Sequence, residues 1–163
     1  MTRPRDHQRS KLYRAEGVLE EQWVTIILDD GPPHEGGTVR IHRREWTTVP
    51  QVQAFVDRVV GSAWWKKRSS IRRIVVKDGR GSSWARASRS DWFGVPEVSI
   101  PKWARSRRVV LHELSHHLTP WEAEAHGAQF ASNLIDLVRR FMSAEDADRL
   151  VESFRVAKVK HRV

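Results

Sequence analysis

The residues best suited to do chemistry in this chain form a His-Glu-x-x-His motif that runs from His112 to His116. On a helix the two histidines are one turn apart and share a face, while Glu113 lies beside that face. Two imidazoles in this arrangement can hold a zinc ion, and a carboxylate next to them can act as a general base. The motif therefore predicts a zinc hydrolase with His112 and His116 as metal ligands and Glu113 as the catalytic base.

A third metal ligand is decisive, because catalytic zinc usually takes three protein ligands and the motif alone also occurs by chance. Glu122 follows His116 at the spacing that the metzincins use, but their pattern has glycine where this chain has Thr119. His126 is the preferred candidate. It falls on a predicted second helix with a short connection to the first, which would bring it beside His112 and His116.

Helices are expected around the motif. Apolar spacing predicts three of them in succession, at 105–118, 119–142 and 143–157. The second has the residue types of a helix start, with Thr119 as the N-cap, Pro120 in the first turn and Glu122 completing a capping box. This prediction makes Glu122 a cap rather than a metal ligand.

Upstream of the motif, the chain alternates between strand-like segments and one helix. Strands are predicted at 22–28, 38–42, 71–77, 83–89 and 96–100. The helix is expected at 48–63, a loop at 29–37 and a turn at 78–81. These elements predict an α+β domain.

The composition limits the kind of protein and the kind of metal site. A chain of 163 residues suits one domain, expected here at 11–157, with a disordered basic segment at 1–10 and a basic tail at 158–163. There is no cysteine, so any metal must be held by His, Asp or Glu. No segment has the apolar length of a membrane span or of a signal peptide core, so we expect a cytoplasmic protein without a membrane partner.

The net charge of +9 suits nucleic acid as a partner and equally serves solubility. Basic clusters at 66–68, 72–73 and 105–108 are the candidates for a nucleic-acid surface. The oligomeric state is left open by the sequence.

The histidine-rich segments resemble known zinc peptidases. The motif followed by His126-Gly127-x-x-Phe130 is similar to the SprT-like metallopeptidases among the small gluzincins. The segment 124–131 also resembles the ImmA/IrrE-type peptidases, in which the ligand at this place is Glu. More closely, the chain resembles a family of actinobacterial metallohydrolases known mainly by its HExxH motif, through the segments 5–9, 13–16 and 55–57.

This resemblance implies a zincin-like (minigluzincin) fold, in which a small, twisted, mostly antiparallel sheet packs on the motif helix and the helices that follow it. It also implies Zn²⁺ bound by His112, His116 and His126, and hydrolysis of a peptide or protein substrate. An edge strand, at 83–89 or 96–100, would pair with an extended substrate. SprT-like relatives act on DNA-bound proteins, so a nucleic-acid-associated protease is an alternative. A metal-stabilised binding protein without turnover is another.

Two more residues are open to interpretation. His117 lies one turn after Glu113, where it is a candidate to stabilise the oxyanion or to support the metal ligands. Tyr13 is the only tyrosine, and its distance along the chain gives it no definite role.

Overall fold

The computed structural model describes residues 4–19, 23–25, 38–40, 45–88 and 94–162. Its helices are α1 (Arg9–Glu16), α2 (Val49–Gly61), α3 (Ala63–Lys66), α4 (Arg107–Leu118), α5 (Ala128–Phe141) and α6 (Ala144–Val156), with short 3-10 turns at Gly17–Leu19 and Lys102–Ala104. Its strands are β1 (Trp23–Thr25), β2 (Thr38–Arg40), β3 (Val75–Asp78), β4 (Arg86–Ser88) and β5 (Glu97–Ile100). The α+β class predicted from the sequence is confirmed.

The main sheet has three strands in the order β3-β5-β4. The central strand β5 runs parallel to β3 and antiparallel to β4, so the sheet is mixed rather than mostly antiparallel. Strand β4 is an edge strand of this sheet. Strands β1 and β2 form a separate antiparallel pair, and the loop predicted at 29–37 lies outside the described residues.

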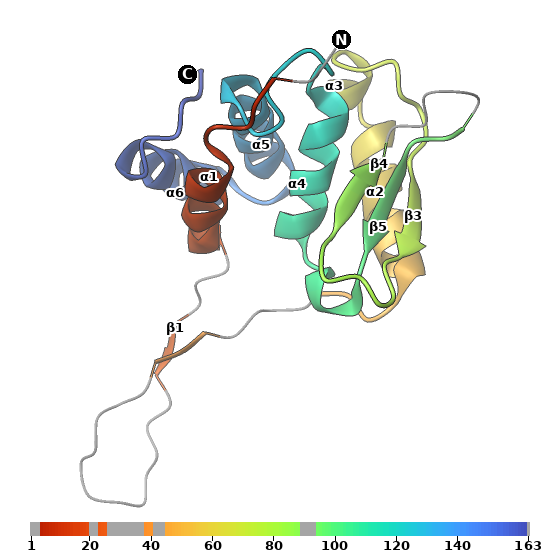
Figure 1. Cartoon of the computed structure of the whole chain (residues 1–163). Coiled ribbons are helices and arrows are strands. Elements are labelled where there is room, and N and C mark those ends of the chain that lie inside the picture. The colour runs from red at the N-terminus through yellow and green to blue at the C-terminus, as the bar shows by residue number, and fades with distance from the viewer. Residues whose placement is uncertain (1–3, 20–22, 26–37, 41–44, 89–93, 163) are drawn as a thin grey trace, which may run out of the picture.

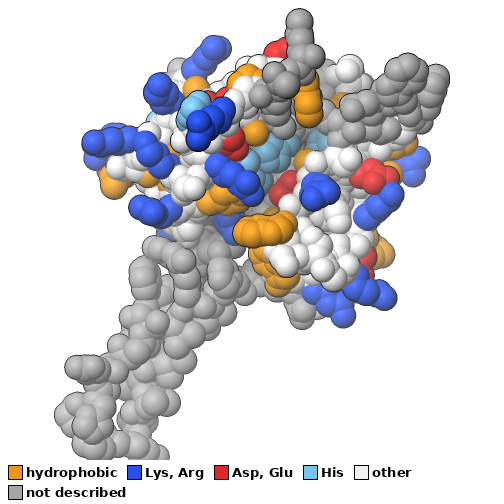
Figure 2. All heavy atoms as spheres, viewed as in Figure 1, with side chains coloured by type: hydrophobic (Ala, Val, Ile, Leu, Met, Phe, Trp, Pro, Cys, Tyr) orange, Lys and Arg blue, Asp and Glu red, His pale blue; other side chains and the backbone are white. Residues whose placement is uncertain are grey.

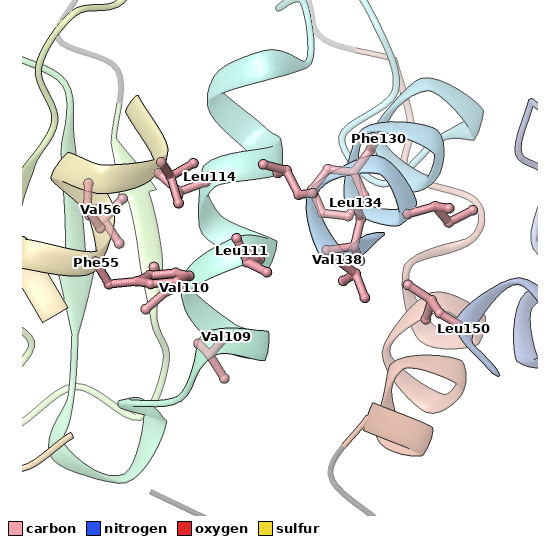
Figure 3. Close-up of a cluster of buried hydrophobic side chains, with 14 of the residues drawn as sticks. Phe55, Val56, Val109, Val110, Leu111, Leu114, Phe130, Leu134, Val138 and Leu150 are labelled. Atoms are coloured by element: carbon pink, nitrogen blue, oxygen red, sulfur yellow. The ribbon is translucent and has the colours of Figure 1, made fainter. Parts of the chain in front are cut away.

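Helix α4, which carries the motif, runs through the middle of the molecule (Figure 1). The sheet and α2 lie on one side of it, and α1, α5 and α6 lie on the other. Val110 extends from α4 toward Phe55 of α2, whereas Leu111 extends toward α5 (Figure 3). Both α4 side chains are fully buried, and a buried aliphatic side chain contributes about 1.5–3 kcal/mol. Packing on both sides holds α4, the helix that carries the motif, in place.

The helix predicted at 119–142 begins only at Ala128, and residues 120–127 form turns instead. Thr119 is the C-cap of α4, and its hydroxyl donates to the carbonyl oxygen of Ser115 at 2.7 Å. A hydroxyl committed to the end of one helix does not cap the start of the next, so the predicted capping box is wrong. Glu122 is exposed in the turn segment and caps nothing.

The other helix predictions hold. The motif helix is α4, and the helix predicted at 48–63 is α2, with Pro50 in its first turn. The helix predicted at 143–157 is α6, in which the Ser143 hydroxyl accepts a hydrogen bond from the Asp146 backbone N–H at 2.9 Å. In the part of the chain that the structure describes, none of the helices has the length and apolar character that a membrane crossing requires.

Residues 4–10 and 158–162 pack onto the domain, whereas positions 1–3 and 163 of the segments predicted as a disordered N-terminus and a basic tail lie outside the described residues. Helix α1 begins at Arg9, and Leu12 within it is fully buried. Gln8 joins the two ends, because its amide nitrogen donates to the Lys160 carbonyl at 3.1 Å and its amide oxygen accepts from the Lys160 N–H at 2.9 Å. Val159 is also buried. These apolar anchors are too few to show as a pattern in a basic, polar sequence.

Candidate metal centre

Three histidine side chains meet between α4 and the turn that precedes α5. His112 and His116 lie one turn apart on α4, and His126 lies two residues before Ala128. The ring centroids are 5.1 Å apart for His112 and His116, 5.3 Å for His112 and His126, and 4.8 Å for His116 and His126. One ligand nitrogen of each lies within 4.8 Å of the others, close enough to bind a metal ion. The predicted convergence of these three residues is confirmed.

The spacing of one pair of these nitrogens suits a small tetrahedral ion. Two imidazole nitrogens at zinc bonding distance and the tetrahedral angle would lie about 3.4 Å from each other. Nε2 of His112 and Nε2 of His126 are 3.4 Å apart. The position of His126 is right, although it is reached through a turn and not, as predicted, on a helix. Gly127 permits that turn, because a Cβ there would lie 2.8 Å from the Cβ of Glu124.

Carboxylates contact the far side of two of the rings. Nδ1 of His112 lies 2.8 and 3.0 Å from the two carboxylate oxygens of Glu16, and Nδ1 of His126 lies 2.6 Å from Oδ2 of Asp6. An ionised carboxylate only accepts hydrogen bonds, so each Nδ1 carries the hydrogen and each Nε2 is left to face the common centre. Local spacing does not mark either carboxylate as a neighbour of the histidines, although both lie in the segments 5–9 and 13–16 that carry the family resemblance.

The surroundings shift the pKa values of the two buried rings in opposite directions. Burial lowers the pKa of His126, and this outweighs the opposing effect of Asp6. For His112, burial also acts to lower the pKa, but the Glu16 carboxylate outweighs it and the pKa is raised. The Glu16 carboxylate favours a second proton on the His112 ring. A metal cation bound at Nε2 would take the place of that proton.

Glu113 lies on the side of α4 that faces the edge strand. It is 4% exposed, and a backbone hydrogen bond from Ala87 of β4 helps to hold its carboxylate. Burial is the main cause that raises the pKa of Glu113, and the charges of His112 and the Ala87 hydrogen bond oppose it. A raised pKa makes the Glu113 carboxylate a stronger proton acceptor.

The histidines open onto a cavity of about 490 Å³. Figure 2 shows histidine side chains, in pale blue, in a hollow near the centre of the view. One wall of the cavity is strand β4 and the other is the N-terminal segment. Its lining includes Glu113, His116, His126, Asp6, Arg9, Tyr13, Trp121 and the β4 residues Arg86, Ala87 and Ser88. The acid of the motif and two of the three histidines therefore share one accessible space.

Tyr13 belongs to this cavity, which the sequence alone did not indicate. Its ring stacks on His112 at 5.0 Å between centroids with 26° between the planes, and it lies 5.2 Å from the His126 ring. Burial, followed by the charges of Glu113 and Glu16, raises the pKa of Tyr13 to about 12. The phenol therefore keeps its proton at neutral pH and can donate a hydrogen bond.

His117 and Glu122 lie apart from the three histidines. The His117 ring is buried, and its Nε2 lies 3.3 Å from the carbonyl oxygen of Glu97 in β5. It is not among the residues that line the cavity. This position connects α4 to the sheet and gives no support to an oxyanion role for His117. Glu122 is not part of the group of described residues that could hold a metal ion.

The arginines of the basic cluster at 105–108 pair with acidic side chains of the same domain. Arg105 is 3% exposed and bonds to Asp78 at 3.1 Å, while Arg108 bonds to Glu16 at 3.2 Å. Arg107 pairs with Glu45 at 2.8 Å. The clusters at 66–68 and 72–73 are exposed, as a nucleic-acid surface would require.

Comparison of the chain with protein-family models, with curated proteins and with solved structures finds no match. The functional interpretation of this protein therefore rests on the geometry of the histidine site and of the cavity onto which it opens.

Proposed function

We propose that this protein is a zinc-dependent hydrolase whose substrates are peptides or proteins. The observation that carries the proposal is the convergence of His112, His116 and His126 beside the buried carboxylate of Glu113. Imidazole nitrogens suit zinc, and three protein ligands leave a position for water, as in catalytic sites. The cavity at His116 and His126 favours this open type of site over a closed structural one.

The roles of the side chains follow from their positions. When bound, zinc acidifies a water molecule and polarises a substrate carbonyl. Glu113 is the group that receives the proton on its carboxylate and delivers it to the leaving nitrogen. The hydrogen bond from Ala87 keeps that carboxylate oriented between the two transfers.

The edge strand supports a peptide as the substrate. Arg86, Ala87 and Ser88 of β4 line the cavity, and β4 lies at the edge of the three-stranded sheet. An extended peptide that pairs with an edge strand presents its backbone carbonyls along that strand. Here this would carry a peptide bond past Glu113.

The proposal is tested by metal analysis together with a peptide digest. The purified full chain should bind about one zinc ion and should cleave members of a mixed peptide library, with the products identified by mass spectrometry. A chelator should stop cleavage, and added zinc should restore it. Zinc-loaded protein that cleaves no peptide, or protein that takes up no zinc, would contradict the proposal.

We expect the Tyr13 hydroxyl to donate a hydrogen bond to the oxyanion that develops on the substrate carbonyl. Tyr13→Phe removes this donor and is therefore expected to lower kcat by about 10²-fold. The phenyl ring keeps the stacking on His112, so zinc affinity and KM should change little. Steady-state kinetics on one cleaved peptide, with metal analysis of the same sample, measures both. An unchanged kcat would remove Tyr13 from the reaction, and a loss of zinc would give it a structural role instead.

A further inference from the structure

Both carboxylates that contact the metal-site histidines come from one short N-terminal segment. Asp6 bonds to His126 at 2.6 Å, and Glu16 bonds to His112 at 2.8 and 3.0 Å. The histidines themselves come from α4 and from the turn before α5. The segment therefore supports two ligands that lie on different elements.

We propose that residues 4–19, here called the N-terminal clamp, complete the metal centre, so that zinc binds tightly only when the clamp is docked and bound zinc holds the clamp in place. This inference rests on the metal site of the proposed function. It concerns metal loading, not turnover, and it makes Asp6 and Glu16 positioning residues.

Glu16 attaches the end of α1 to α4 at two points. Its side chain is fully buried, and its carboxylate contacts both His112 and, at 3.2 Å, Arg108. Those two residues lie one turn apart on α4, so a carboxylate held by both has little freedom to move. The His112 ring is thereby fixed with Nε2 directed at the common centre.

The start of the clamp holds the turn that carries His126. Asp6 bonds to the ring, Gln8 donates its amide N–H to the His126 carbonyl oxygen at 2.7 Å, and the His7 backbone N–H donates to the Glu124 carboxylate. Residues 120–127 have no helix of their own to fix them. These contacts therefore determine where the third ligand sits.

The clamp is anchored at a distance from the histidines. Leu12 and Ala15 are buried, and α6 supplies hydrogen bonds from the Ser153 hydroxyl to the Ala15 carbonyl at 2.9 Å and from Arg149 to the Val18 carbonyl at 2.8 Å. Docking on α6 thus places both carboxylates at the rings. Any factor that lifts the clamp from α6 would also disturb the metal ligands.

Coupling of this kind is reciprocal. If the docked clamp strengthens zinc binding by some factor, zinc must strengthen docking by the same factor. Partners that orient a metal ligand typically change metal affinity by about 10–100-fold when they are removed. The clamp has two such partners, and a loss of that size is measurable for each.

Asp6→Asn is the sharpest test, because Asp6 lies at the surface end of the clamp and its loss leaves the buried Glu16–Arg108 pair intact. We expect the Kd for zinc of the full chain, measured against a competing chelator, to rise about 10–100-fold. Asp148→Asn is the matched control, since Asp148 pairs with Arg139 on the exposed side of α6 and does not touch the site. Equal zinc affinity in Asp6→Asn and wild type would overturn the inference.

A double-mutant cycle separates positioning from general weakening. In a His126→Ala background, Asp6→Asn should cause no further loss of zinc affinity, because Asp6 acts through that ring. If Asp6 served only the overall fold or the general charge of the cavity, the two losses would add.

Hydrogen exchange tests the reverse direction of the coupling. Zinc should slow exchange of the backbone amides in Arg9–Glu16, whereas amides of α2, which lies across α4 from the clamp, should not change. Equal protection of α1 with and without zinc would contradict the inference. A wild-type chain that binds no zinc would end both this inference and the proposed function. If the clamp variants lower zinc affinity but the zinc-loaded chain hydrolyses no peptide, only the proposed function is refuted.

Discussion

Glu113→Gln is expected to reduce kcat by about 10²–10⁴-fold while leaving zinc bound, because the amide cannot take up a proton but nearly preserves the shape of the side chain. Glu113 is 4% exposed beside the three histidines and does not belong to the ligand group. The amide oxygen can still accept the hydrogen bond from Ala87, so the local structure should be kept. Peptide cleavage and zinc content measured on the same preparation give the result.

The matched control for this variant is Glu152→Gln, which removes a carboxylate on the exposed side of α6. Its activity and zinc content should equal those of the wild type. Full activity in Glu113→Gln would place the base elsewhere and would refute the assigned role of the motif. Loss of zinc in Glu113→Gln would instead mean that the carboxylate helps to hold the metal.

The local part of the site was predictable because it depends on helical spacing alone. His112 and His116 share a face of α4, as the one-turn spacing requires. The convergence of His126 with these two residues was predicted correctly, but its element was not, because the residue types at 119–122 resemble a helix start. The Thr119 hydroxyl bonds back to Ser115, and this tertiary context overrides the local pattern.

The non-local part of the site was not predictable from one sequence. Asp6, Tyr13 and Glu16 meet the histidines through packing of the N-terminal segment against distant parts of the chain. Nothing in local spacing marks such long-range pairs, and the basic, polar composition at 1–10 favours disorder on compositional grounds alone. The edge position of β4 likewise depends on strand order, which strand-forming residues do not specify.

His126→Ala is expected to raise the Kd for zinc by more than about 10²-fold, which exceeds the usual loss when only a supporting partner of a ligand is removed. His126 is 6% exposed, and its Nε2 lies 3.4 Å from Nε2 of His112, so an alanine leaves one of the three converging nitrogens missing. Competition with a chelator measures the change. Thermal unfolding gives a second measure, since zinc at about 100 times its Kd stabilises the wild type by about 2.7 kcal/mol and should stabilise the variant far less at the same free zinc.

His161→Ala is the matched control, because His161 lies in the C-terminal segment beside Phe154 and bonds to the Val159 carbonyl, away from the three histidines. Its zinc affinity should equal that of the wild type. The zinc affinities of His126→Ala and Glu122→Ala together identify the third ligand. If His126→Ala keeps wild-type affinity, the third ligand is another group of the cavity, and Asp6, which lies 2.6 Å from the His126 ring, is a candidate to replace it. If His126→Ala loses zinc and Glu122→Ala does not, the site is the three-histidine centre that the turn before α5 completes.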